Sequence, residues 1–216
     1  MKDLKKKKLN RRESIKAGAA SIGIALVATG TLRGETGEQP LGPFFPNRGT
    51  PSFPVKENPD PNIPNHLAND ADLTFVKGRT EDAEGQIIYV KGRLTDRHKD
   101  PIANATIIIW QASSSGRYNH NGDSSNKFFR HPKTGNIIGR HLDENFQFWG
   151  KVHTDSAGNY LFKTVVPGFY PADLSSGWYR PPHIHFMVTA MGREQFVTQM
   201  YFGGAIADNN FIQELN

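Results

Sequence analysis

Short apolar runs separated by turn residues make up the chain from about residue 72 onward. Residues 87–94 (IIYVKGRL) begin with β-branched and aromatic side chains, which favours a strand. Residues 105–111 (ATIIIWQ) are almost entirely apolar, as expected for a strand that is buried on both faces. The turn sequence TDRHKDP separates the two runs, so both are predicted to be strands.

Two further pairs of runs each enclose a turn that contains glycine. Residues 151–154 and 160–164 flank the turn 155–159, and they are predicted to form a hairpin. Residues 183–189 and 195–202 form a second predicted pair. At least six strands, without a convincing amphipathic helix, predict an all-β fold: an antiparallel β-sandwich with long loops.

Two segments interrupt the pattern of strands. Residues 35–71 are rich in Pro, Gly and Asn, which predicts an extended arm on the surface of a domain formed by residues 72–216. Between Tyr118 and Phe146 lies a long segment rich in Asn, Gly and His, without periodicity. A loop of this length in a compact domain is usually functional, and a disordered excursion is the alternative.

The net charge of +5 belongs to the N-terminal end of the chain. Residues 1–34 carry nine Lys or Arg and two acidic side chains, whereas the remaining 182 residues carry 17 basic and 19 acidic side chains. The body of the protein is therefore slightly acidic. It has no electrostatic feature that favours binding to nucleic acid.

The basic N-terminal end has the layout of an export signal. The Arg11–Arg12 pair precedes residues 17–32, which carry no charge and are rich in Ala, Gly and Ile. This apolar stretch is shorter than the roughly 20 residues of a membrane span but suits the core of a signal peptide. We therefore predict that residues 1–34 are a twin-arginine-type signal, recognised by the twin-arginine export machinery.

Such a signal predicts export to the periplasm or another extracytoplasmic location, with a membrane tether if the signal is not cleaved. A solvated basic tail and an amphipathic anchor are the alternative interpretations of residues 1–34.

The chain contains no cysteine, which narrows the chemistry that it can support. Disulfide scaffolds, thiolate zinc sites, iron–sulfur clusters and cysteine nucleophiles are excluded. Any metal ion must be held by His, Tyr, Asp or Glu. The 37% of hydrophobic residues is enough for a core and excludes a disordered chain.

The densest group of reactive side chains lies in PGFYPADLSSGWYRPPHIHF, which contains Tyr170, Arg180, His183 and His185. Side chains two residues apart on a strand point to the same face, so His183 and His185 can present two imidazoles to one point. Two imidazoles on a rigid strand suit a metal site. Taken alone, the HxH pattern is more often a pair of exposed polar residues.

Four segments give this pattern its context: VKGRLTDRHKDPIANATIIIWQASSSGRYNH, DENFQFWGKVHTDSAGNYLFKTVVPGFYP, RPPHIHF and TQMYF. Together they span about residues 86–202 and resemble the intradiol ring-cleavage dioxygenases, the family of protocatechuate 3,4-dioxygenase and catechol 1,2-dioxygenase. The order of the segments and the frame of GRY, PGxYP and RPxHIH are highly specific. The frame is closer to the protocatechuate type.

The resemblance implies a mononuclear non-haem Fe(III) as cofactor, in a sandwich of the intradiol dioxygenase or prealbumin-like type. Tyr118 of GRYNH matches the equatorial tyrosine ligand and Tyr170 of PGFYP the axial one, while His183 and His185 match the two histidine ligands. Hard, anionic phenolates favour the ferric state. The implied substrates are a catechol-type aromatic and O₂, and the implied product is a cis,cis-muconate-type diacid from cleavage between the two hydroxylated carbons.

The resemblance also implies three catalytic residues and a substrate pocket. Tyr170 matches the ligand that takes a proton from the substrate, and Arg180 matches the arginine that stabilises negative charge on the substrate. Gln199 matches a glutamine that hydrogen-bonds near the substrate and Arg180. Trp110 matches a pocket tryptophan. The alternatives are a surface arginine in an ion pair, a strand-face glutamine and a core tryptophan.

The chain departs from the family pattern in two places. Ala172 follows Pro171 where the protocatechuate branch often has Trp, which alters that wall of the pocket. The sequence ends at Asn216, soon after TQMYF, where family members normally continue. Either the chain is a short variant or the sequence is incomplete, and a sandwich that lacks its final strand is compatible with both.

Two other functions compete with the enzyme. A non-catalytic, prealbumin-like binding module would use the same sandwich without the Tyr–Tyr–His–His set, and a metalloprotein could hold zinc or copper in place of iron. The sequence does not select one catechol among several, and a homo-oligomer is compatible with it.

Overall fold

The computed structural model describes residues 36–46, 71–76, 78–123 and 127–202. The predicted signal at residues 1–34, most of the predicted arm and residues 203–216 lie outside these ranges. The division into three segments and the lack of a final strand therefore stay predictions. Within the described ranges, no helix is long and apolar enough to cross a membrane.

The described chain is all-β, as predicted, apart from one short 3₁₀ turn. Its elements are β1 (Ile87–Arg93), β2 (Thr106–Gln111), η1 (Asn121–Asp123), β3 (Phe128–Arg130), β4 (Ile137–Gly139), β5 (Trp149–His153), β6 (Asn159–Val165), β7 (Tyr170–Asp173), β8 (Trp178–Arg180), β9 (His183–Thr189) and β10 (Phe196–Tyr201).

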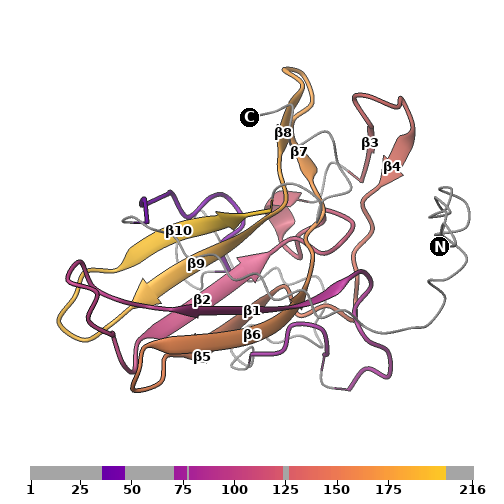
Figure 1. Ribbon diagram of the computed structural model, residues 1–216. Coiled ribbons are helices and arrows are strands. Elements are labelled where there is room, and N and C mark those ends of the chain that lie inside the picture. Colours follow the sequence, from indigo (N-terminus) through magenta and orange to yellow (C-terminus); the bar gives the residue numbers. More distant parts are fainter. Residues whose placement is uncertain (1–35, 47–70, 77, 124–126, 203–216) are drawn as a thin grey trace, which may run out of the picture.

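The strands form one larger sheet, one strand pair and two small hairpins (Figure 1). The larger sheet has the order β10-β9-β2-β5, and β1 pairs with β6; all of these pairs are antiparallel. The predicted pairing of the runs 183–189 and 195–202 is therefore confirmed, as β9 and β10. The hairpins β3-β4 and β7-β8 were not predicted, because their strands are only three or four residues long.

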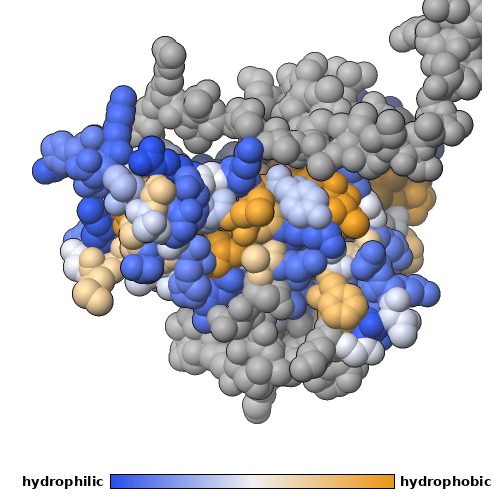
Figure 2. Space-filling view, turned by 60° about the horizontal axis from the view of Figure 1, so that its bottom comes forward, coloured by the Kyte–Doolittle hydropathy of each residue, from blue (hydrophilic) through white to orange (hydrophobic). Residues whose placement is uncertain are grey.

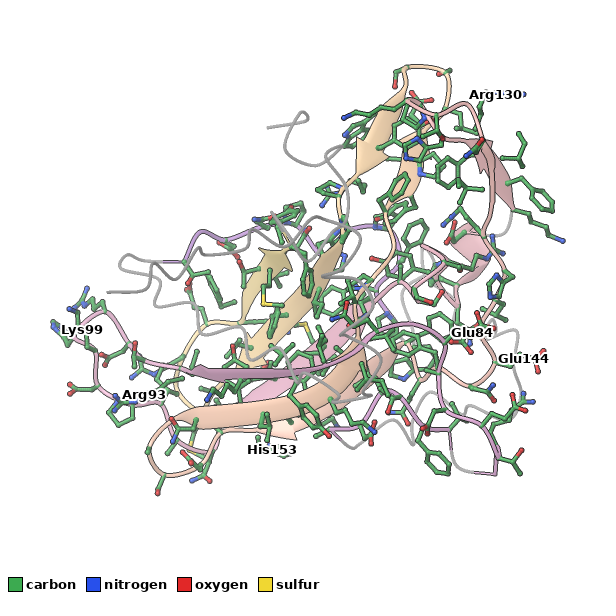
Figure 3. All side chains as sticks on the ribbon, turned by 45° about the vertical axis from the view of Figure 1, so that its right-hand side comes forward. Glu84, Arg93, Lys99, Arg130, Glu144 and His153 are labelled. Carbon is green, nitrogen blue, oxygen red and sulfur yellow. The ribbon has the colours of Figure 1, made fainter. Side chains whose placement is uncertain are left out.

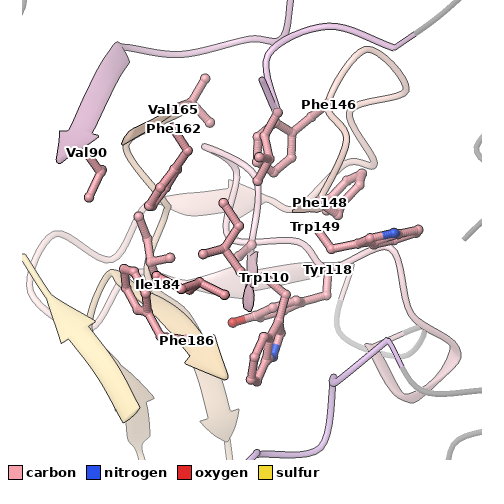
Figure 4. Close-up of a cluster of buried hydrophobic side chains, with 14 of the residues drawn as sticks. Val90, Trp110, Tyr118, Phe146, Phe148, Trp149, Phe162, Val165, Ile184 and Phe186 are labelled. Carbon is pink, nitrogen blue, oxygen red and sulfur yellow. The ribbon is translucent and has the colours of Figure 1, made fainter. Parts of the chain in front are cut away.

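The core lies between the β1-β6 pair and the larger sheet (Figure 4). Phe162 of β6 packs against Phe186 of β9, with ring centroids 5.9 Å apart. Val90 of β1 and Ile184 of β9 are buried in the same cluster. Because side chains alternate along a strand, Ile184 and Phe186 face this core while the two histidines of β9 face the opposite side of the sheet.

The predicted hairpin around residues 155–159 is wrong. The turn itself forms, with Gly158 at φ +79° and the Asp155 side chain accepting bonds from Ala157 N and Asn159 N. However, β5 pairs with β2 and β6 pairs with β1, so this turn carries the chain from one sheet to the other. Turn residues dictate a local reversal, but they do not decide whether the strands beyond it stay paired.

Part of the predicted arm, residues 36–46, runs along the free edge of β10. Gln39 N donates to Val197 O at 2.9 Å, and Thr198 Oγ1 donates to Gly37 O at 2.8 Å. This segment covers the edge of the larger sheet and lies on the face that carries the histidines of β9.

The long segment between Tyr118 and Phe146 forms regular structure and packs against the rest of the protein in its described residues, 118–123 and 127–146. It contains η1 and the hairpin β3-β4, which stands beside β7-β8 in Figure 1. The two hairpins share a small second core, in which the ring centroids of Phe129 of β3 and Tyr179 of β8 are 5.7 Å apart. Phe128 of β3 and Trp178 of β8 are exposed.

Hydrophilic side chains cover much of the described surface on the face in Figure 2, and hydrophobic side chains gather in smaller patches between them. The labelled charged residues and His153 likewise lie on the outside of the molecule in Figure 3.

Candidate metal centre

Two buried imidazoles lie close together at the beginning of β9. His183 and His185 are 2% and 3% exposed, and their Nε2 atoms are 3.1 Å apart. Burial lowers the pKa of His183 to about 4 and that of His185 to about 2. The neighbouring His183 and Arg180 lower the pKa of His185 further by charge repulsion. Both rings are therefore neutral at neutral pH, and two lone pairs can point at one place.

Neighbouring groups orient both imidazole rings. The Nδ1 atom of His183 lies 2.6 Å from Pro181 O, so Nδ1–H donates to this carbonyl and leaves Nε2 free to act as a ligand. The indole of Trp110 stacks on His185, with 4.6 Å between centroids and 10° between planes. Nδ1 of His185 is buried and has no hydrogen-bond partner among the described residues.

Two buried tyrosines complete the group. The hydroxyl of Tyr118 lies 3.4 Å from His183 Nε2, and the rings of Tyr118 and Tyr170 are 5.5 Å apart and nearly perpendicular. The two hydroxyls are hydrogen-bonded to each other. The structure thus brings together all four side chains that the sequence assigned to a metal: Tyr118, Tyr170, His183 and His185.

Burial keeps both phenols protonated when no cation is bound. Desolvation raises the pKa of Tyr118 well above its usual value, and the hydrogen bond with Tyr170 raises it further. Desolvation raises the pKa of Tyr170 to about 12, although the same hydrogen bond and Arg180 act in the opposite direction. A hard, highly charged cation is the kind of partner that displaces such protons.

The donor set fits a ferric ion. Two neutral imidazoles and two ionisable phenols supply two nitrogen and two hard oxygen donors. Among the described residues, no group of three or more His, Asp or Glu gathers at a possible metal site.

Close glycine contacts bring the two tyrosine-bearing loops together. Gly168 N donates to Ser113 O at 2.9 Å. A Cβ on Gly168 would overlap the backbone nitrogen of Gly116, and a Cβ on Gly116 would overlap the carbonyl of Phe169. Only glycine permits this approach, which places Tyr118 and Tyr170 side by side.

We expect Gly168→Ala to destabilise the protein by about 2–3 kcal/mol, because the added methyl group forces the two backbones apart. For a chain of this size, this corresponds to a fall in melting temperature of roughly 5–10 °C in calorimetry. Gly37→Ala is the matched control, since a Cβ there meets nothing within 4 Å. Equal melting temperatures for the two variants would contradict this account of the loop contact.

The low histidine pKa values predict a pH dependence for the iron-free protein. The unfolded chain takes up protons at an imidazole pKa near 6.5, whereas the folded chain resists protonation of His183 down to about pH 4. The stability contributed by the neutral rings is therefore complete above pH 6.5 and is lost as the pH falls toward 4. We expect the urea midpoint to fall over this window, and a smaller fall in His183→Gln. A flat midpoint would contradict the prediction.

Arg180 lies beside the tyrosines and is held by a polar network. It stands directly opposite Tyr170 in the β7-β8 pair. Its Nη2 donates to Gln199 Oε1 at 2.6 Å and to the hydroxyl of Tyr201 at 3.1 Å. The Tyr201 hydroxyl also lies 2.9 Å from Gln199 Oε1 and from Gln39 Oε1, and its single proton can be donated to either acceptor. The predicted contact between Arg180 and Gln199 is thus present.

Sequence reasoning missed Tyr201. Its position two residues after Gln199 places both side chains on one face of β10, which was the available signal. Trp110 is almost fully buried, and its indole stacks on His185. Direct contact of Trp110, Gln199 or Arg180 with a substrate stays a prediction.

The N-terminal arm also reaches the centre, which the sequence did not predict. Phe44 packs against Tyr118, with centroids 4.6 Å apart, and Phe45 packs edge-on against Trp110 at 4.8 Å. Gly42 has φ +77°, and a Cβ there would lie 3.3 Å from His185 Cε1. The sequence GPFF in an otherwise polar arm was the signal for this contact.

Four other histidines of the described chain, His120, His131, His141 and His153, make contacts with other residues. The Nε2 atom of His141 lies 2.8 Å from Glu84 Oε2. The Nδ1 atom of His153, on β5, lies 3.3 Å from Oγ1 of Thr106, on β2. His120 packs near Phe44, with centroids 5.7 Å apart, and His131 contacts Phe169.

A family model described as Dioxygenase matches residues 60–214, more than half of the chain. The chain belongs to the intradiol ring-cleavage dioxygenase family. Its resemblance to that family, inferred from the four sequence segments, is therefore confirmed. The four converging side chains are those that the resemblance implies as metal ligands.

Several dioxygenases are similar to the chain. The β chain of protocatechuate 3,4-dioxygenase from Burkholderia cepacia is 34% identical over 161 residues, which cover 71% of this chain and 63% of that protein. Hydroxyquinol 1,2-dioxygenase from a Rhizobium species is 25% identical and covers 64% of this chain and 45% of that protein. The chain thus spans less than two thirds of the length of these curated relatives.

Among solved structures, the dioxygenase domain of a dioxygenase–carbohydrate-binding protein fusion from Streptomyces sp. SirexAA-E is similar at 25% identity. The match covers 78% of this chain and 75% of that chain, with a TM-score of 0.48.

Proposed function

We propose that the protein is an Fe(III)-dependent intradiol dioxygenase. It would use O₂ to open the ring of a catechol-type aromatic between its two hydroxylated carbons, giving a cis,cis-muconate-type diacid. The observation that carries this proposal is the convergence of Tyr118, Tyr170, His183 and His185 in one buried cluster. Ring opening by this route adds both atoms of O₂ to the catechol, so no external reductant is needed.

The four side chains are the proposed iron ligands. Once both phenols have lost their protons to solvent, two phenolates and two neutral imidazoles give the ligand set a net charge of −2, which favours Fe(III) over divalent ions. When bound, the ferric ion supplies Lewis acidity toward the two catechol oxygens. The stacked Trp110 and the carbonyl of Pro181 keep the two imidazoles in place for this task.

Tyr170 is the proposed general base. Its pKa of about 12 in the metal-free protein means that its phenolate holds a proton tightly, so it can take one from a catechol hydroxyl. Tyr118 lies deeper and its hydroxyl is tied to His183 and Tyr170, which suits a ligand that stays in place.

Arg180 is the proposed stabiliser of negative charge. Its guanidinium is permanently positive, and Gln199 and Tyr201 hold it in one orientation beside Tyr170. A fixed cation of this kind stabilises charge that builds up on the substrate without having to reorganise.

We also propose that the protein is exported by the twin-arginine route. The support is the Arg11–Arg12 pair followed by the uncharged residues 17–32. This route exports folded proteins, which suits an enzyme that acquires its metal before export.

The enzyme proposal is tested by oxygen uptake with a panel of catechol, protocatechuate and hydroxyquinol. The iron-loaded protein should consume one O₂ per substrate molecule for at least one of them and release a ring-opened diacid. Zinc-loaded protein should consume none, which separates iron from the zinc alternative. Catechol binding without oxygen uptake by the iron-loaded protein would instead support a binding module.

A further inference from the structure

A buried ion pair lies behind the two tyrosines and has no role in the function proposed so far. Arg140 Nη2 and Asp123 Oδ2 are 2.6 Å apart, and their side chains are 0% and 5% exposed. Both residues belong to the long segment after Tyr118 that the sequence marked as functional by its length alone.

The pair holds the backbone on both sides of Arg117. Asp123 Oδ2 accepts a hydrogen bond from Tyr118 N at 2.8 Å. Arg140 donates to the carbonyl of Gly116, from Nε at 3.0 Å and from Nη2 at 2.5 Å. The turn that presents the Tyr118 ring is therefore fixed at its entry and at its exit by one ion pair.

The same arginine reaches the second tyrosine. The guanidinium carbon of Arg140 lies 5.5 Å from the centroid of the Tyr170 ring, within the range of a cation–π contact. Gly116, whose carbonyl Arg140 binds, itself presses against the backbone of Phe169, next to Tyr170. Arg140 is thus in contact with the supports of both tyrosines at once.

A purely stabilising role explains this arrangement poorly. A buried ion pair is often no more stabilising than apolar side chains of similar volume, because both charges lose their hydration. An apolar pair would fill the same space but would bind neither Tyr118 N nor Gly116 O. The ion pair supplies hydrogen bonds to the backbone of Tyr118 and Gly116, and a cation beside the ring of Tyr170.

We propose that Asp123 and Arg140 are positioning residues, which set the orientation of the Tyr118 and Tyr170 rings relative to each other. This proposal rests on the proposed function, in which the two tyrosines are the anionic ligands of the metal. Neither residue is proposed to touch the substrate.

The test compares the single variants Asp123→Asn and Arg140→Met with the double variant Asp123→Leu/Arg140→Met. The double variant removes both charges and so leaves neither one buried and unpaired. Arg193→Met is the control, because Arg193 forms an exposed pair with Asp96. Each full-length protein is loaded with iron, and its urea midpoint, visible absorption maximum, kcat and KM are measured.

We expect the double variant to recover most of the midpoint that the single variants lose, yet to keep a shifted absorption maximum and a kcat at least about tenfold below the parent, with KM changed less than about threefold. Recovery of the absorption maximum and kcat together with the midpoint would overturn the proposal, since the pair would then serve stability alone.

A crystal structure of the iron-free double variant gives a readout that does not depend on the proposed function. The angle between the rings of Tyr118 and Tyr170, 88° in the parent, should change, and an unchanged angle would overturn the positioning role. Failure of the enzyme proposal looks different, because the parent protein itself would then bind no iron and consume no oxygen.

Discussion

Replacement of Tyr118 by Phe should abolish the visible colour of the iron-loaded protein and lower kcat/KM for a catechol by at least about 1,000-fold, or ~4 kcal/mol. The phenyl ring fills the same buried space but offers no oxygen donor, so the site loses a negative charge and one of its four proposed ligands. The measurements are the absorption spectrum after iron loading and the initial rate of oxygen uptake.

Tyr89→Phe is the control for this variant. Tyr89 lies on the outer, exposed side of β1, so its hydroxyl can be removed without touching the centre. The control should keep the parent's spectrum and rate. A Tyr118→Phe protein with unchanged colour and rate would remove Tyr118 from the ligand set.

Arg180→Met should lower kcat by about 100- to 1,000-fold while leaving iron binding and visible colour largely intact. The change removes a fixed positive charge next to Tyr170 but none of the four proposed ligands. Methionine keeps much of the length of the side chain, which limits the effect on packing. Steady-state kinetics and an iron assay on the same sample measure the two effects separately.

Arg180→Lys supplies the comparison for this prediction. It restores the charge but not the guanidinium nitrogen Nη2 that bonds to Gln199 and Tyr201, so an intermediate rate is expected. If Arg180→Met lost its iron as well as its activity, the arginine would be a structural support of the site and not a stabiliser of charge on the substrate.

Much of the fold could be predicted because its strands carry local patterns. Residues 105–111 are almost entirely apolar, and residues 106–111 form β2, an inner strand of the larger sheet. The partner strands of β5 and β6 could not be predicted, because they depend on which surfaces the two strands bury. The contact between Phe162 and Phe186 lies between the two sheets and links residues far apart in the sequence.

The four metal-binding candidates could be named from motifs, since each falls within a short segment that resembles the family, such as PGFYP or RPPHIHF. The residues that hold these four side chains in place could not be named in this way. Gly42 and Phe44 come from an arm more than 100 residues before His185 and Tyr170, and Asp123 and Arg140 sit in a segment without periodicity. Only folding brings these residues to the centre. The sequence GPFF stands out in the arm, but no local pattern shows which part of the protein it contacts.

The colour of the purified, iron-loaded protein tests the central claim most directly. If Tyr118 and Tyr170 bind Fe(III) as phenolates, the protein should absorb broadly in the visible range through charge transfer from phenolate to iron, and it should appear red to burgundy. A correctly folded protein that stays colourless and iron-free after iron reconstitution would contradict the account.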